Sequence, residues 1–73
     1  MRDWNAHAKA VLRAEMTRRQ IRSADLADLL AELGIEENKR NLGNKIARGT
    51  FSAAFFLQCL AAMKAQNLHL GEA

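Results

Sequence analysis

The stretch Asn38–Gly49, NKRNLGNKIARG, decides the fold that we predict for this chain of 73 residues. Its spacing predicts one short helix with Leu42 and Ile46 on the buried side. No acid occurs in the stretch, and the other faces carry only bases and amides, namely Lys39, Arg40, Asn41, Asn44, Lys45 and Arg48. Cations neutralise phosphates, and Arg and Asn pair bidentately with base edges. The pattern is therefore typical of a helix that lies in the major groove of DNA.

The composition of the whole chain indicates a small helical domain. Its length is near the lower limit for an independent core, and 49% of the residues are hydrophobic. No proline and only four glycines interrupt it, which favours helices joined by tight turns. A deep substrate pocket is not expected at this size. The sequence also shows neither a nucleophile beside a base nor a glycine-rich phosphate loop. We therefore expect that the protein is not an enzyme and binds no cofactor.

The cysteine and the histidines give no sign of a metal site. Cys59 is the only cysteine and sits in an apolar run, which predicts an inert buried thiol. His7 and His69 lack partners at metal-ligand spacing. No window approaches 18 uninterrupted apolar residues, and the N-terminus lacks the apolar run of a signal peptide. We therefore expect no membrane association and a cytoplasmic protein, associated with the nucleoid if it binds DNA.

Four helices are predicted in a single domain, over residues 4–18, 24–33, 39–48 and 53–64, followed by a short C-terminal tail. The N-caps expected from side chains that accept backbone hydrogen bonds are Asp3, Ser23, Asn38 and Ser52. Gly34 and Gly49 are expected to end the second and third helices in the left-handed conformation.

The apolar residues recur at helical spacing and define an inner face for each helix. The predicted face of the first helix is Trp4, Ala8, Val11, Leu12 and Met16, and that of the second is Leu26, Leu29, Leu30 and Leu33. Phe51 and Phe56 flank Ser52 at the spacing of a hydrophobic staple. The last helix is apolar almost all round, so it is either the central core helix or partly a dimer surface.

Charge is segregated along the chain. Residues 25–37 contain five acids and no base, whereas residues 38–71 contain five bases and no acid. A third basic group, Arg18, Arg19 and Arg22, lies at the first junction between helices. This distribution predicts a molecule with a positive and a negative side, which suits an anionic partner.

Two helices joined at a glycine, the second of them basic, form a helix-turn-helix. The order of several short motifs resembles the phage-repressor and Cro-type helix-turn-helix domain: Leu12-Arg13, Leu26-Ala27, Leu33-Gly34-Ile35 and Ile46-Ala47-Arg48-Gly49. The resemblance covers roughly residues 12–63. It implies an all-α, lambda-repressor-like domain of four compact helices in a small bacterial or phage transcriptional regulator. In that fold residues 24–33 would be the supporting helix and residues 39–48 the recognition helix.

The string from Asn44 to Leu60, NKIARGTFSAAFFLQCL, is similar to the hallmark of a small bacterial family of helical domains without an assigned function. The chain also departs from the repressor pattern. From Gly34 to Gly49 it is about three residues longer than the usual turn and recognition helix, and Gly43 stands where a second apolar residue is usual.

Double-stranded DNA is accordingly the expected partner. The candidates for base edges are Arg40, Asn41 and Asn44, and the candidates for phosphates are Lys39, Lys45, Arg48, Ser23 and Thr50. One recognition helix reads only a few base pairs, so we expect a homodimer through the last helix and the C-terminal tail.

The acidic face of residues 25–32 argues for a second hypothesis, because an acidic face near a duplex would be repelled. On that hypothesis the chain is a protein-interaction adaptor or an antitoxin-like module. Its acidic face would then meet a basic protein. The basic face of residues 39–48 would in that case be only a solvated helix surface.

Overall fold

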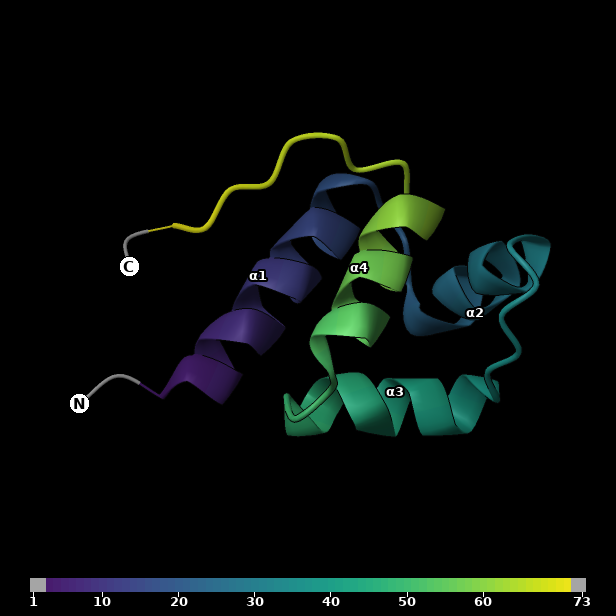
Figure 1. The fold of residues 1–73 in the computed structure, drawn as a ribbon, viewed down its shortest axis with the longest axis horizontal. Helices are drawn as coiled ribbons and strands as arrows, with labels where there is room; N and C mark the ends of the chain where they lie inside the picture. Colours follow the sequence, from purple (N-terminus) through teal and green to yellow (C-terminus); the bar gives the residue numbers. More distant parts are fainter. Residues whose placement is uncertain (1–2, 72–73) are drawn as a thin grey trace.

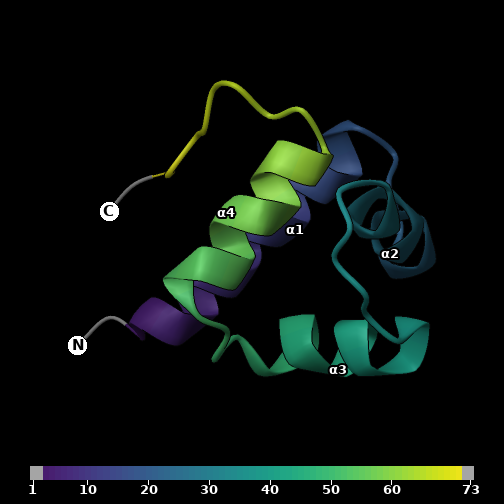
Figure 2. The same cartoon turned by 45° about the vertical axis from the view of Figure 1, so that its right-hand side comes forward.

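The computed structural model describes residues 3–71, which form four α-helices and no strand. The helices are α1 (Trp4–Arg18), α2 (Ser23–Glu32), α3 (Lys39–Arg48) and α4 (Ala53–Ala62). α2 packs against both α3 and α4, and α1 packs against α3. Figures 1 and 2 show α3 on one side of the molecule and the C-terminal tail on the opposite side, where the tail returns along α1.

Three of the four predicted N-caps are confirmed. The Asp3 carboxylate accepts hydrogen bonds from two backbone N–H groups of α1, the Asn38 side chain does the same for α3, and the Ser52 hydroxyl accepts one at α4. The prediction for Ser23 is wrong, because Ser23 is already the first residue of α2 and Arg22 is the cap. The Asp25 carboxylate accepts from the backbone N–H of Arg22 at 3.0 Å, which starts the helix one residue early.

α2 and α4 both end in a Schellman motif, which explains why both helices end earlier than predicted. α2 ends at Glu32, one residue earlier than predicted, and Gly34 follows with φ +80° as expected. The N–H of Ile35 donates to the Leu30 carbonyl at 3.0 Å, which completes a Schellman motif. α4 ends two residues early in the same motif, with Lys64 at φ +57° in place of glycine.

All four helices contribute side chains to the core, and four of the predicted inner-face positions are not fully buried in it. Ala8 and Leu29 are half-buried. Trp4 and Leu33, predicted on inner faces, are 62% and 53% exposed. Trp4 begins α1 beyond the reach of the core, and Leu33 is the residue after the last turn of α2. The buried apolar side chains are Val11, Leu12, Met16, Leu26, Ala27, Leu30, Leu42, Ile46, Phe55, Cys59, Leu60, Ala62 and Met63.

The hydrophobic staple at the start of α4 is confirmed. The rings of Phe51 and Phe56 stack with their centroids 5.9 Å apart and their planes 5° from parallel. Phe51 also lies 5.6 Å from Phe55, which is buried in the core. The three rings fix the angle at which the chain leaves α3 and enters α4.

Gly43 lies inside α3 where this helix crosses the start of α2. A Cβ added there would meet the Ser23 hydroxyl at 3.8 Å, which is ordinary van der Waals contact. Because glycine is a poor helix former, we expect Gly43→Ala to raise the free energy of unfolding by about 0.5–1 kcal/mol. Thermal and urea unfolding followed by circular dichroism measure this change. A destabilised variant would mean that the crossing of α2 and α3 needs closer contact than the structure has.

Candidate nucleic-acid interface

α3 presents one side to the core and the other to solvent. Leu42 and Ile46 are buried, and Gly43 faces α2. The side chains of Arg40, Asn41, Asn44 and Arg48 are exposed. Figures 1 and 2 show that neither the tail nor any other helix covers the outer side of α3. The predicted helix therefore stands on the surface with its polar side open.

The exposed side of α3 keeps its hydrogen-bonding groups available. Within residues 3–71, no ion pair or hydrogen bond engages the side chains of Arg40, Asn41, Asn44 and Arg48; the Asn38 side chain accepts only from the backbone N–H groups of Arg40 and Asn41. Two guanidinium groups and two amides on a helix of ten residues give a dense set of donors with two additional acceptors. Such a surface can contact anionic oxygens and planar hydrogen-bonding edges at the same time.

The ammonium group of Lys45 makes contacts within the fold and is not part of the open side of α3. Its ammonium group lies 2.7 Å from a carboxylate oxygen of Glu37 and 4.3 Å from the centre of the Phe55 ring. The side chain is 38% exposed and that of Glu37 only 16%. The ion pair and the cation–π contact tie the loop before α3 to the core helix α4. Sequence spacing alone placed Lys45 among the phosphate ligands, because the fold that brings Glu37 and Phe55 to it is not visible there.

Lys39 stands between α3 and the acidic face of α2. Its ammonium nitrogen lies 3.6 Å from the Asp28 carboxylate, and both side chains are well exposed. An ion pair of this kind is weak and easily exchanged for another anion. The acidic face of α2 therefore does not point entirely away from α3, since Asp28 borders its first turn.

The sequence reasoning missed one basic residue at the other end of α3. Lys9 of α1 donates from its ammonium group to the carbonyl of Ala47 at 3.2 Å. A cation at this position stabilises the negative end of the helix dipole and satisfies one of the free carbonyls. Lys9 is separated from Ala47 by 38 positions in the chain, so no local pattern could reveal the contact.

The remaining two candidates flank α3 without entering its open side. Ser23 is half-buried at the start of α2, where it faces Gly43. Thr50 is exposed directly after the left-handed Gly49 that ends α3. Both residues lie next to backbone N–H groups, at the start of α2 and before α4.

Two of the three arginines at the α1–α2 junction, Arg18 and Arg19, form ion pairs within the fold. Glu15 is completely buried, and its carboxylate oxygens lie 2.5 Å from an Arg18 nitrogen and 2.6 Å from an Arg19 nitrogen. These two hydrogen bonds, with a further one from the backbone N–H of His69, lower the pKa of Glu15 to about 2. Glu15 thus joins the end of α1 to the C-terminal tail.

The chain also matches the model of a protein family. The model is that of a domain of unknown function, DUF6471, and it matches residues 4–68, almost the entire length of the chain. The chain belongs to the DUF6471 family. No curated protein and no solved structure matches the chain. The family match extends from the start of α1 into the tail, so it contains the whole of α3 and the residues that hold it.

Cys59 is buried as predicted, and burial raises the pKa of its thiol to about 12, so the reactive thiolate is suppressed. Among residues 3–71 no three His, Cys, Asp or Glu side chains are placed to hold a metal ion. None of the helices in this part of the chain has the length and apolar character to cross a membrane.

The buried Glu15 gives this DUF6471 domain a predicted acid sensitivity. Its pKa is lowered in the folded state, so it stabilises the fold above its ordinary value of 4.5, and this contribution is lost as the pH falls from there to about 2. We expect the melting temperature of the wild type to fall over that interval and that of Glu15→Gln to change much less. Glu36→Gln, which removes an exposed carboxylate, is the control. Parallel profiles for the wild type and Glu15→Gln would contradict the assignment.

Proposed function

We propose that the chain is a sequence-specific, double-stranded DNA-binding protein of the helix-turn-helix type, with α3 as the recognition helix and α2 as its support. The observation that carries the proposal is the open side of α3. Arg40, Asn41, Asn44 and Arg48 are exposed there with no acid among them. Bases and amides of these types read base edges in the major groove, and an α-helix fits that groove. The role we infer is that of a small transcriptional regulator that is associated with the nucleoid.

The support for α3 fits such a role. A recognition helix must be held rigidly from its back, because base contacts require side chains placed to within a fraction of an ångström. α3 is held by Leu42 and Ile46 in the core, by the Asn38 cap at its start and by Lys9 at its end. Every one of these restraints acts on the inner side or at the ends, which leaves the outer side available.

The contacts divide by chemistry into two sets. Arg40, Asn41 and Asn44 are proposed to contact base edges, since they lie within the first six residues of α3 on its open side. Lys39, Arg48, Ser23 and Thr50 are proposed to contact phosphates from the two ends of α3 and from the start of α2. Lys45 is left out of the set, because Glu37 and Phe55 hold its ammonium group.

A second candidate function rests on the acidic face of α2. Asp25, Asp28 and Glu32 are all exposed on this one helix. A protein-interaction adaptor or antitoxin-like module would use that face to bind a basic protein. The two functions differ in what binds α3, so a measurement on DNA separates them.

The test begins with a randomised pool of DNA duplexes, because the preferred sequence is not needed in advance. The purified protein is used to select duplexes over several rounds, and the affinity for the selected duplex is measured by fluorescence anisotropy at several salt concentrations. A phosphate-binding protein loses affinity with a log–log slope of about −0.9 for each contact. Lys39 and Arg48 are the cations among the proposed phosphate contacts, so we expect a slope of roughly −2 for each recognition unit. Failure to enrich any sequence at physiological salt would favour the adaptor.

The position of Asp28 beside α3 leads to a separate prediction. Its carboxylate competes with DNA phosphate for Lys39 and would repel the backbone of a bound duplex. We therefore expect Asp28→Asn to bind DNA about two- to fivefold more tightly, the range of an exposed ion pair. Glu32→Gln removes the same charge from the same helix at a site without an ion pair in the described chain, and we expect a smaller change. Equal effects would mean that only net charge matters.

A further inference from the structure

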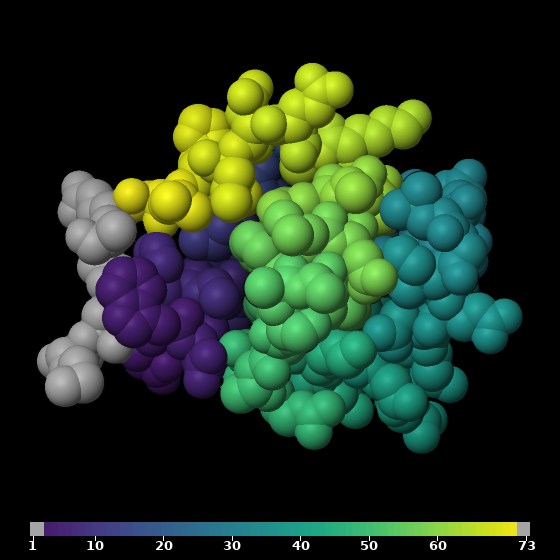
Figure 3. All heavy atoms as spheres, in the orientation of Figure 1, coloured from purple at the N-terminus to yellow at the C-terminus, as the bar shows by residue number. Residues whose placement is uncertain are grey.

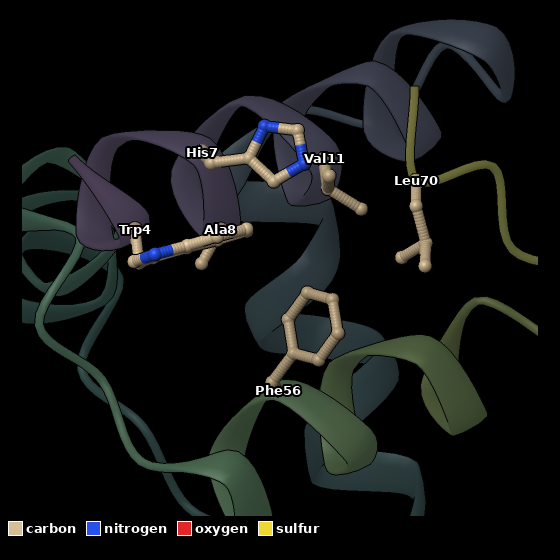
Figure 4. A pocket seen from close by; sticks show the side chains of 6 residues that line it. All are labelled: Trp4, His7, Ala8, Val11, Phe56 and Leu70. Atoms are coloured by element: carbon tan, nitrogen blue, oxygen red, sulfur yellow. The ribbon is translucent and has the colours of Figure 1, made fainter. Parts of the chain in front are cut away.

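Reading a base edge requires side chains that donate and accept hydrogen bonds, and the surfaces of this molecule differ in that respect. A groove between α1, α4 and the tail, which we call the apolar groove, has no residue of α3 in its lining. Figure 4 shows that its side chains consist mainly of carbon: Trp4, His7, Ala8, Val11, Phe56 and Leu70. In Figure 3, α3 lies along the lower edge of the molecule and the yellow tail along the upper edge. The hydrogen-bonding side chains that can reach a base are therefore those on the open side of α3.

Asn44 lies at the centre of this open side. An α-helix turns by about 100° for each residue, so Asn44 is about 160° around the axis from both buried residues, Leu42 and Ile46. Arg40 and Arg48 come one turn before and one turn after Asn44, each about 40° from it around the axis. The N-terminal part of a recognition helix is the part that contacts bases. Arg40 and Asn44 are thus the pair that faces away from the core within that part of α3.

The surroundings of Asn44 allow a close approach to DNA. An asparagine amide is joined to the backbone by a single CH₂ group, so it reaches a base only if the helix lies deep in the groove. The exposed Ala47 beside it ends at its Cβ atom. Arg40 and Arg48 have no ion-pair partner in residues 3–71 and are free to extend toward the DNA. No bulky side chain held in place on the open side therefore keeps Asn44 from the floor of the groove.

We propose that Asn44 reads an adenine and Arg40 reads a guanine, so that the half-site bound by α3 contains an A·T pair and a G·C pair close together. This inference rests on the proposed function and adds the identity of two bases to it. Four residues of helix advance about 6 Å along the axis, whereas successive base pairs are about 3.4 Å apart. The two pairs are therefore adjacent or separated by one base pair.

The donors and acceptors of each side chain determine the base. The Asn44 amide nitrogen donates to N7 of adenine, and its carbonyl oxygen accepts from the N6 amino group. The Arg40 guanidinium has donors only, and it donates to both O6 and N7 of guanine. Cytosine is selected by a carboxylate that accepts from its N4 amino group, and α3 contains no acid. The side chains of α3 thus favour purines on the strand that they contact.

The first test uses the duplex selected from the randomised pool and its single-base-pair variants as probes. For the wild type, replacing the A·T or the G·C pair is expected to weaken binding by roughly 5- to 150-fold, the range of a bidentate contact. Asn44→Ala should lose this preference at the A·T pair only, and Arg40→Ala at the G·C pair only. Arg40→Lys keeps the charge and still donates to guanine, so it should retain part of the preference. Competition titrations followed by fluorescence anisotropy measure each ratio.

A modified base tests the contact of Asn44 atom by atom. Replacing the adenine by 7-deazaadenine removes the N7 acceptor and leaves Watson–Crick pairing intact. We expect this probe to bind the wild type roughly two- to tenfold more weakly, the effect of one hydrogen bond, and Asn44→Ala with unchanged affinity. Asn41→Ala is the matched control, because it removes the same amide about 100° around the axis from Leu42, at the edge of the open side. It should remain as sensitive to the modified base as the wild type.

A change of specificity gives a readout that a structural role of Asn44 would not produce. Asn44→Asp has the same shape but only accepts hydrogen bonds, so the preferred base at this position should change from adenine to cytosine. Circular dichroism verifies that each variant keeps its helices. Should Asn44→Ala not fold, Asn44→Asp and the modified base with the wild type decide the question.

The outcomes distinguish this inference from the proposed function. A pool that yields no enriched sequence would overturn both. An enriched sequence whose A·T preference persists in Asn44→Ala would overturn the base assignment and leave DNA binding by α3 in place. The same holds for equal weakening of the wild type and Asn44→Ala by 7-deazaadenine.

Discussion

Replacing Arg40 and Asn44 together by alanine is expected to abolish sequence preference in DNA binding. Each bidentate contact to a base contributes about 1–3 kcal/mol of discrimination, so losing two should reduce the ratio of specific to non-specific affinity by about 30-fold or more. Competition titrations of a selected duplex against random duplex measure that ratio. Because both side chains are exposed and engage no other side chain of residues 3–71, the melting temperature should scarcely move.

The control for this experiment removes the same two residue types elsewhere. Arg13 lies on the outer side of α1 and Asn67 in the tail, and both are exposed. Arg13→Ala combined with Asn67→Ala loses the same charge and the same amide, and we expect it to retain sequence preference. A large drop in the melting temperature of the Arg40 and Asn44 variant would instead assign these residues to the fold.

Gly49→Ala is expected to destabilise the fold strongly, although it adds only one methyl group. Gly49 has φ +69°, a conformation that costs an L-residue about 1–2 kcal/mol. A Cβ there would also lie 2.8 Å from the backbone oxygen of Asn5, so α1 and α3 would have to separate. Such overpacking costs about 1–3 kcal/mol more. We therefore expect the free energy of unfolding to fall by about 2–5 kcal/mol, measured by urea denaturation.

Gly34→Ala separates the two causes. Gly34 also has a left-handed backbone, with φ +80°, but nothing lies within 4 Å of an added Cβ. Only the conformational cost remains, so this variant should lose about 1 kcal/mol. Equal losses at Gly34 and Gly49 would show that the close approach of Asn5 to Gly49 contributes nothing.

The sequence predicted the helices well because their signals are local. Asp3, Asn38 and Ser52 lie next to the backbone groups that they cap, and Gly34 and Gly49 lack the Cβ that would strain a left-handed helix end. The end of α1 was predicted correctly, whereas that of α4 was predicted two residues too late, although Gln20 and Lys64 both take the left-handed conformation without being glycine. There the Schellman hydrogen bonds and the packing of Ile21 and Ala65 override the local preference.

The sequence predicted which residues of the candidate site are polar, but not which of their side chains remain free to bind a partner. The amphipathic spacing of α3 correctly separated Leu42 and Ile46 from the polar positions. Which cations remain available depends on contacts from other elements, such as Glu37 and Phe55 at Lys45. Burial of Glu15 was likewise invisible, since a glutamate in the last turns of a helix normally faces solvent and its arginine partners read as a surface cluster.

The two contacts between α1 and the end of α3 have a mechanical consequence. On one side of α1, the Asn5 backbone contacts Gly49 and the Lys9 ammonium group donates to the Ala47 carbonyl. The neighbouring residues Trp4 and Ala8 line the apolar groove. A displacement of this end of α1 would therefore move the end of α3 with it, because the two helices are in direct contact there. If α3 reads DNA as proposed and two copies bind side by side, the spacing of their half-sites would depend on how α1 and α3 pack against each other.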